Sequence, residues 1–413
     1  MKKKASEVFI AGGQPSITYN PRKKYKLEEQ LIEYLDTGYK LLSISGPTKS
    51  GKTVLCRKII PTSKGIWIPG GQIQTETDFW TTVLDKLGTP INYTIESGSE
   101  NSRTIAGQFD GGINFGIASS KGHISRSKTG KTTQKISEQF VRNPRIFAIQ
   151  QLLEAKVPLV IDDFHYIPRE VQSSIVRALK DPIFEGLRVV IIAVPHRAYD
   201  AVRVEKEMTG RVTQLQIPLW TPDELKEIPQ KGFPELNAHC PEATIERFTR
   251  ESFGSPHLIQ EFCLRLCYDN DLREQSDNLT FILEPGDYAQ FFKRIALSAS
   301  KLAFERLASG PRPRTDRIIR DFSDGSKGDI YVAILKALAQ TGPKTEIQYE
   351  EIRAGLRNVL VGQLPKANEV TRVLGKMSEI AREQKDGEPV LEWVNNTLYI
   401  ADPFFAFYLK WNS

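Results

Sequence analysis

The stretch that decides the fold is SISGPTKSGKTVLCRKII, residues 43–60. It follows a short hydrophobic run, passes through a turn rich in glycine, lysine and serine, and continues into a helix-like pattern at 54–60. The turn at 46–53 matches G-x-x-x-x-G-K-[ST] at every fixed position. In such a loop the backbone N–H groups surround a phosphate, and the helix that follows directs its positive end at it. The sequence therefore predicts a P-loop that binds ATP or ADP.

The pattern also assigns roles to single residues of the loop. Lys52 is expected to reach the β- and γ-phosphate oxygens, and the Thr53 hydroxyl to bind Mg²⁺. The residues expected to contact the nucleotide are Gly46, Pro47, Thr48, Lys49, Ser50, Gly51, Lys52, Thr53 and Val54.

A second motif supplies the acids that phosphate chemistry needs. In VPLVIDDFHYIP, residues 157–168, an apolar run ends in Asp162 and Asp163. Open α/β sheets bind ligands at the carboxyl ends of their strands, where these acids would lie. We expect Asp162 to bind Mg²⁺ and Asp163 to orient or deprotonate the attacking water.

The surrounding pattern alternates short apolar runs with helical periods. Strands are predicted at 66–68, 159–161 and 187–194, with helices at 75–87 and 170–179. This alternation predicts an α/β fold, a P-loop NTPase parallel sheet with helices on both faces. His196 and Arg197 follow the last of these strands, where each could sense a γ-phosphate or simply form a surface turn.

Two downstream features could complete the site. Arg211 stands before a strand-like run, as an arginine finger for a neighbouring subunit or as a surface ion-pair residue. Gly254-Ser255-Pro256 opens an apolar helix whose first turn, with Pro256 and His257, would face the base and sugar.

Together these motifs resemble the AAA+-related signal-transduction ATPases called STAND, and the archaeal and origin-recognition ATPases of the same clan. The resemblance covers roughly 19–268 and implies that Tyr19 and Arg22 line the adenine. It also implies an oligomer or a separate effector protein as partner. The chain departs from the AAA+ pattern at Asp163, where Glu is usual, and lacks a clear sensor arginine in the lid. These departures imply slow or partner-dependent hydrolysis.

The last third predicts a different module. Helices at 330–340, 349–360 and 368–383, followed by a hairpin at 390–400, are typical of a winged helix. This module either meets the nucleotide or a partner, or binds DNA through its third helix; the basic residues of that helix region are Lys366, Arg372, Lys376 and Arg382. The end of the chain, 398–411, resembles that of archaeal ATPases carrying such a domain.

The expected domains are an N-terminal arm at 1–24, an ATPase core at 25–218 with an inserted loop or hairpin at 91–139, a helical lid at 219–308, a basic linker at 309–328 and a winged-helix domain at 329–413. The 91–139 insertion is basic and rich in glycine, serine and threonine, either a surface hairpin or a segment that contacts DNA or a partner.

Composition limits the possible functions. The net charge of +6 over 413 residues permits contact with DNA without arguing for it. Four scattered cysteines exclude a disulfide framework and favour a reducing cytoplasm. The longest apolar run, 189–194, is too short to cross a membrane.

Three function classes fit this sequence. The first is an ATP-dependent switch that oligomerises or signals to a separate effector, in antiviral defence for example. The second is a DNA-binding ATPase, a replication initiator or a transposition regulator. The third is a nucleotide-binding scaffold without turnover.

Overall fold

The computed structural model describes residues 2–89, 92–96, 137–141, 143–194, 210–311, 317–342, 344–382 and 389–412. The chain forms two compact units. The sheet unit comprises Glu28–Ser45 and Cys56–Gln216; the helical unit comprises Met1–Leu27, Gly46–Leu55 and Ile217–Ser413.

The sheet unit is built on five parallel strands in the order β2-β5-β6-β1-β7. These are β1 (Leu41–Ser45), β2 (Ile66–Pro69), β5 (Leu159–Asp162), β6 (Val189–Ala193) and β7 (Val212–Gln216). The three strands predicted at 66–68, 159–161 and 187–194 are present as β2, β5 and β6. The short hydrophobic run before the P-loop forms β1, and the strand-like run after Arg211 forms β7, an edge strand beside β1. The predicted parallel sheet is thereby confirmed.

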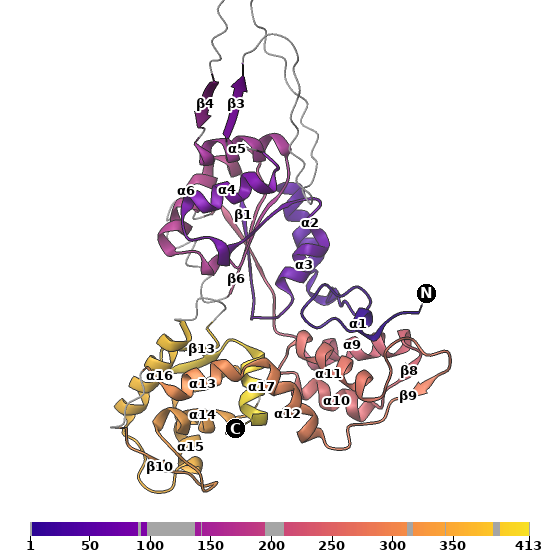
Figure 1. The fold of residues 1–413 in the computed structure, drawn as a ribbon, viewed down its shortest axis with the longest axis vertical. Helices are drawn as coiled ribbons and strands as arrows, with labels where there is room; N and C mark the ends of the chain where they lie inside the picture. The colour runs from indigo at the N-terminus through magenta and orange to yellow at the C-terminus, as the bar shows by residue number, and fades with distance from the viewer. Residues whose placement is uncertain are drawn as a thin grey trace, which may run out of the picture. The chain divides into compact units, whose positions relative to one another are not determined.

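Helices cover both faces of this sheet (Figure 1). On one face, alternate strand residues such as Leu159 and Ile161 join a core with α4 (Glu76–Lys86), α5 (Pro144–Ala155) and α6 (Arg169–Phe184). On the other side lies α2 (Leu27–Thr37), whose Tyr34 hydroxyl accepts a hydrogen bond from the Val189 backbone N–H at 2.9 Å. Full burial of successive residues in β6 matches this two-sided cover.

Most of the insertion at 91–139 lies outside the described residues. Its two ends pair antiparallel as β3 (Asn92–Glu96) and β4 (Ser137–Val141).

The helical unit begins with the N-terminal arm, which contains α1 (Ala5–Val8) and the short η1 (Lys23–Tyr25). After the sheet it continues with α9 (Pro222–Glu235), β8 (Ala238–His239), α10 (Glu242–Glu251), α11 (Pro256–Asp269), β9 (Thr280–Phe281), α12 (Tyr288–Ala299) and α13 (Lys301–Ser309). Thr221 caps α9 with a capping box, and Pro222 is the first residue of that helix. α12 and α13 are separate helices, because the backbone leaves the helical region at Ser300 (φ −144°).

The last part of the chain contains α14 (Ile330–Gln340), α15 (Tyr349–Val359), α16 (Ala367–Arg382), β13 (Leu391–Val394), β14 (Thr397–Ile400) and α17 (Pro403–Asn412). These are the three helices and the hairpin that the sequence predicted. Both turn residues, Asn395 and Asn396, have positive φ angles of 50° and 59°, as a tight two-residue hairpin requires. The periodicity did not predict β12 (Glu346–Gln348), which pairs with β14, or the small hairpin of β10 (Arg320–Asp321) and β11 (Lys327–Gly328).

Aromatic packing ties α17 to the middle of the helical unit. The Phe407 ring lies 5.2 Å from that of Phe262 in α11 and 5.9 Å from that of Phe292 in α12. Aromatic pairs at such distances contribute about 0.5–1.5 kcal/mol beyond their buried area. The C-terminal helix is therefore part of this core.

None of the helices in the described part of the chain combines the length and the apolar character that a membrane crossing requires.

Candidate functional site: the P-loop and its surroundings

The P-loop occupies the turn between β1 and α3 (Lys52–Ile59). Lys49 and Gly51 adopt positive φ angles of 58° and 93°, which turn successive N–H groups in the manner of an anion-binding nest. Gly46 has no room for a side chain, because an added Cβ would lie 2.7 Å from the Ile217 carbonyl oxygen. Of the two fixed glycines of the motif, Gly46 is thus required by its close packing against Ile217, and Gly51 by its positive φ angle.

The interior of the loop holds polar groups that suit a phosphate. The Lys52 ammonium is buried and donates to the carbonyl oxygens of Gly46 and Pro47, both at 2.8 Å. The hydroxyls of Thr48 and Ser50 are buried, and within the described part of the chain neither has a hydrogen-bond partner. Buried hydroxyls normally find a partner, so these two are positioned for one that the protein does not supply.

The metal-binding prediction involves Thr53, the second residue of α3, and Asp162, the last residue of β5. Among the described residues no group of three or more His, Cys, Asp or Glu side chains is arranged to hold a metal ion. Mg²⁺ at a phosphate site commonly takes only one or two protein ligands and fills its shell with phosphate oxygens and water. Thr53 and Asp162 carry oxygen atoms of the kind that Mg²⁺ binds, and their joint binding of Mg²⁺ stays a prediction.

The Lys49 side chain contacts the C-terminal part of the chain. Its ammonium forms an ion pair with Asp402 at 2.8 Å and lies 4.0 Å from the centre of the Phe404 ring. Asp402 also caps α17, since its carboxylate accepts the Phe404 N–H at 2.9 Å. The segment that begins α17 therefore rests directly on the P-loop.

His257 belongs to the same cluster. Ser255 caps α11, Pro256 is the first residue of that helix, and the His257 ring stands edge-on to Phe404 with centroids 4.7 Å apart. Burial, followed by the nearby positive charge of Lys49, lowers the pKa of His257, although Glu261 and Asp402 act in the opposite direction. His257 is therefore kept neutral beside Lys49 of the P-loop.

This shift predicts a pH dependence of stability. Because the folded-state pKa of His257 lies below the ordinary value of about 6.5, the unfolded chain takes up a proton first as the pH falls. The stability that this neutral histidine contributes is present at pH 7.5 and is lost as the pH drops below about 6.5. We expect His257→Gln to lose less melting temperature than the wild type between pH 7.5 and 5.5. If His257→Gln and the wild type lose the same melting temperature over this pH range, the lowered pKa assigned to His257 is contradicted.

The N-terminal arm and the start of α9 support the loop from the other side. The Trp220 indole N–H donates to the Ser50 carbonyl oxygen at 2.8 Å, and the Gln14 amide donates to that of Val54 at 3.0 Å. Arg22, predicted to line the adenine, is buried and its guanidinium donates to the carbonyl oxygens of Pro218 and Leu219, both at 2.8 Å.

The same guanidinium pairs with Glu224 at 2.9 Å and lies 4.8 Å from the centres of the Tyr25 and Trp220 rings. Burial acts to raise the pKa of Glu224, but the hydrogen bonds from Arg22 and the Thr221 backbone outweigh it and lower that pKa. Arg22 thus holds the arm to the start of α9. Tyr19 is half-buried in the same arm, and its predicted contact with adenine stays a prediction.

The two acids of the second motif stand at the end of β5. The Asp162 carboxylate accepts the Asp163 N–H at 3.1 Å, and Asp163 is exposed with a left-handed backbone (φ 52°, ψ 41°). A non-glycine residue in this conformation is uncommon and costs roughly 1 kcal/mol or more. The turn therefore fixes the direction in which Asp163 leaves the sheet.

Gly70 provides the space for this turn. An added Cβ on Gly70 would lie 2.4 Å from the Asp163 carbonyl oxygen and 2.9 Å from that of Asp162. On the neighbouring Gly71 it would meet only the Tyr166 ring, at an ordinary 3.8 Å. No local sequence pattern predicts this contact, because Gly70 and Asp163 are far apart along the chain.

We expect Gly70→Ala to slow ATP hydrolysis by about 10²-fold, since displacing a catalytic group by about 1 Å can cost that much. Gly71→Ala is the matched control and is expected to hydrolyse ATP at the wild-type rate. Single-turnover hydrolysis and nucleotide affinity should be measured for both variants. Equal rates in the two alanine variants would show that Gly70 does not position Asp163.

The remaining predicted residues fall in different places. Arg211 is exposed at the amino end of β7, and its carbonyl oxygen accepts the Leu41 N–H at 3.0 Å. His196 and Arg197 lie outside the described residues, so their sensor roles stay predictions.

The basic residues predicted to face DNA are partly neutralised. Lys376 pairs with Glu379 in α16, and Arg382 pairs with Glu392 in β13. Lys366 is exposed just before α16. A DNA-binding face gains affinity from cations that are available to phosphates, which these two pairs reduce.

Comparison with known proteins was made at the levels of sequence and structure. No protein-family model matches the chain, and no curated protein matches its sequence. Among solved structures, the Walker-type ATPase of Pyrococcus abyssi matches with a TM-score of 0.51 and 17% identity, over 94% of this chain and 95% of that one.

Two weaker structural matches belong to the groups that the sequence resembles. The Aeropyrum pernix ORC2 protein, solved with ADPNP and ADP, has a TM-score of 0.48 and 12% identity, over 99% of this chain and 98% of that one. A STAND protein with a tetratricopeptide repeat sensor from Pyrococcus horikoshii has a TM-score of 0.37 and 12% identity, over 96% of this chain and 43% of that one. The chain thus has the fold of the Walker-type ATPase of Pyrococcus abyssi.

Proposed function

We propose that this chain is an ATP-binding, slowly hydrolysing molecular switch. The P-loop binds the phosphates, with Lys52 on their oxygens and the hydroxyls of Thr48 and Ser50 as further donors. Thr53 and Asp162 hold Mg²⁺, and Asp163 orients the attacking water. The similarity in fold to a Walker-type ATPase and the unpartnered hydroxyls in the loop support this reading.

The observation that carries the switch is the contact between Lys49 and Asp402. A nucleotide in the P-loop brings several negative charges to the loop that holds Lys49. The Asp402 carboxylate is then repelled, more strongly by ATP than by ADP because ATP carries an additional phosphate. ATP therefore loosens the contact between the P-loop and the segment that begins α17, and ADP loosens it less.

The loosened C-terminal segment would present its surface to an effector or to further subunits. Signalling of this kind, and a role in antiviral defence, rest on the resemblance of the motifs to STAND ATPases. The alternative of a DNA-binding ATPase is less well supported, because Lys376 and Arg382 have carboxylate partners.

The switch is tested by Asp402→Asn. Asparagine caps helices about as well as aspartate, so the change removes the charge and keeps the start of α17. Coupling is reciprocal: if ATP weakens the contact, weakening the contact strengthens ATP binding. We expect ATP affinity to rise about fivefold, the scale of a partly exposed ion pair, and ADP affinity to rise less.

Asp324→Asn is the matched control, because Asp324 pairs with Lys336 at 2.6 Å and, among the described residues, contacts none of the P-loop. It should leave both affinities unchanged. Binding is measured by titration with fluorescent ATP and ADP analogues in the presence of Mg²⁺. Unchanged ATP affinity in Asp402→Asn would exclude the switch while leaving ATP binding itself intact.

A further inference from the structure

A short extended segment of the helical unit exposes three large apolar side chains in a row. Leu279, Phe281 and Leu283 are 58%, 68% and 73% exposed, whereas Ile282 between them is 3% exposed. Side chains alternate between the two faces of a strand, so the three exposed residues share one face. We name this face the apolar ladder. Strand positions that face water are normally polar, and a contiguous apolar patch usually marks an interaction surface.

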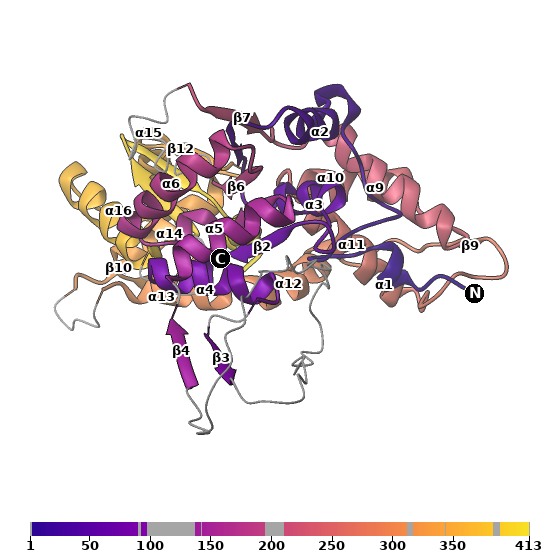
Figure 2. The same ribbon diagram turned by 90° about the horizontal axis from the view of Figure 1, so that it is seen from above.

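The backbone beside the ladder is an open strand edge. β9 pairs only with β8 in a two-stranded sheet of the described residues, and it lies at the periphery of the helical unit (Figures 1 and 2). The N–H groups of Thr280 and Ile282 donate to the carbonyl oxygens of Asn237 and His239, both at 2.9 Å. Since successive residues direct their backbone groups to opposite edges, the N–H and C=O of Phe281 face away from β8. The N–H and C=O of Leu283 bind the Asn270 side chain, at 2.7 and 3.1 Å, so the open part of the edge lies at Phe281. An exposed edge of this kind is a template for a further strand.

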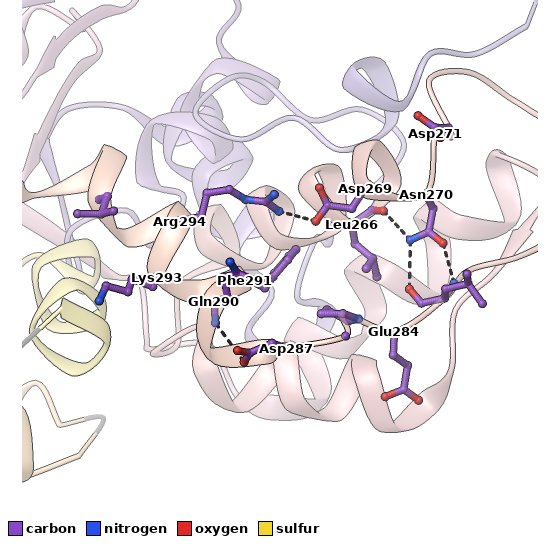
Figure 3. Close-up of a pocket in the computed structure, with 14 residues that line it drawn as sticks. Leu266, Asp269, Asn270, Asp271, Glu284, Asp287, Gln290, Phe291, Lys293 and Arg294 are labelled. Carbon is purple, nitrogen blue, oxygen red and sulfur yellow. Dashed lines mark hydrogen bonds and ion pairs between the residues drawn. The ribbon is translucent and has the colours of Figure 1, made fainter.

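A negatively charged pocket continues from the end of the ladder. Leu283 lines a cavity of about 1020 Å³ whose carboxylates are Asp269, Asp271, Glu284 and Asp287 and whose cations are Lys293 and Arg294 (Figure 3). The four carboxylates outnumber the two cations, Asp269 pairs with Arg294, and Asp287 caps α12. Asp271 and Glu284 are exposed, and Figure 3 draws no interaction from either to another lining residue. The Tyr288 hydroxyl donates to Glu284 at 3.0 Å.

The chain itself shows which chemistry suits this region. Lys2 of the N-terminal arm pairs with Asp277 at 2.9 Å, two residues before the ladder begins, and Lys3 pairs with Glu235. Next to them the Gln275 N–H donates to the Lys3 carbonyl oxygen at 2.7 Å. A lysine-bearing extended segment already binds beside the ladder through both its backbone and its charges.

We propose that the apolar ladder and the acidic pocket bind an extended segment of a partner protein in which apolar side chains alternate with lysine or arginine. The segment adds a strand to the free edge of β9, its apolar side chains cover the ladder, and a cation enters the pocket near Asp271 and Glu284. Strand addition of this type draws affinity from main-chain hydrogen bonds and specificity from alternate side chains. A second copy that presented the same face would bring like charges together, so pairing of two ladders is disfavoured.

The test uses the full chain and a fluorescein-labelled heptapeptide, Lys-Val-Lys-Val-Lys-Val-Lys, without nucleotide. Fluorescence anisotropy should show saturable binding that weakens from 50 to 500 mM NaCl. The Phe281→Ser, Leu283→Ser double variant should bind at least about tenfold more weakly, as expected for the centre of an interface. Asp271→Asn with Glu284→Gln should weaken binding and flatten its salt dependence.

Leu302→Ser is the matched control, because Leu302 is an equally exposed leucine on α13 that lies outside the ladder. It should bind the peptide like the wild type, and thermal unfolding should confirm that all variants are folded. The proposal is overturned if the peptide does not bind, if Lys-Ser-Lys-Ser-Lys-Ser-Lys binds as tightly, or if the ladder variant matches the wild type. It is also overturned if sedimentation shows self-association that the ladder variant abolishes and the peptide does not compete with.

Discussion

Lys52→Ala should abolish ATP binding, with at least a 10²-fold loss of affinity for ATP. The Lys52 ammonium is the buried positive charge inside the P-loop, held between the carbonyl oxygens of Gly46 and Pro47. In P-loop proteins this lysine reaches the β- and γ-phosphates, and the backbone N–H groups alone cannot balance the charge of both. The rate of ATP hydrolysis should fall as well, because ATP no longer binds.

Lys58→Ala controls for the loss of a lysine from the same helix. Lys58 is exposed on α3 and pairs with Glu28 at 3.5 Å, away from the loop. Titration with a fluorescent ATP analogue in Mg²⁺ should give wild-type affinity for Lys58→Ala and no measurable binding for Lys52→Ala. Wild-type affinity in Lys52→Ala, with an unchanged melting temperature, would refute the P-loop assignment and the function built on it.

The parts of the site that the sequence predicts are those with a local signal. The P-loop turn and the helix that begins at Pro256 need only a few neighbouring residues to specify them, and the structure has both where the pattern placed them. Likewise the apolar runs that form β5 and β6 predict buried parallel strands, because a strand buried on both faces does not alternate between apolar and polar residues.

Contacts between distant residues leave no such signal. Lys49 and Asp402 are 353 positions apart, and either residue alone reads as an ordinary surface charge. The contacts of the Arg22 guanidinium with Pro218, Leu219 and Glu224 are likewise invisible in the local sequence, and the implied contact of Arg22 with adenine stays a prediction. Gly70 is similar, since only the approach of the Asp163 backbone explains why no side chain fits there.

Arg211→Ala should lower the rate of ATP hydrolysis by about 10³-fold and leave ATP affinity nearly unchanged, as expected for an arginine finger. Arg211 is exposed beside Leu41, the first residue of β1. An exposed arginine is available to a neighbouring subunit, and a finger of this kind acts on the nucleotide of that subunit.

If two subunits share the site, the rate of ATP hydrolysis depends on the protein concentration. A finger given to the next subunit makes a head-to-tail contact, so hydrolysis per subunit should rise with protein concentration. Lys40→Ala, which removes an exposed cation next to Leu41 at the same edge, should retain the wild-type rate if the effect is specific to the finger. Arg211→Lys should recover only part of the activity, because lysine lacks the forked geometry that binds phosphate oxygens in pairs.

Mixing two inactive variants separates a finger from a structural arginine. Lys52→Ala has an intact Arg211, and Arg211→Ala has an intact P-loop, so a mixed pair contains one complete site. Activity that returns on mixing, at a fixed total concentration, requires that one subunit complete the site of another. No rescue, together with a rate per subunit that is independent of concentration, would make Arg211 an ordinary surface residue. Arg197, which follows β6 in the sequence, would then be the better candidate for the cation that stabilises the transition state.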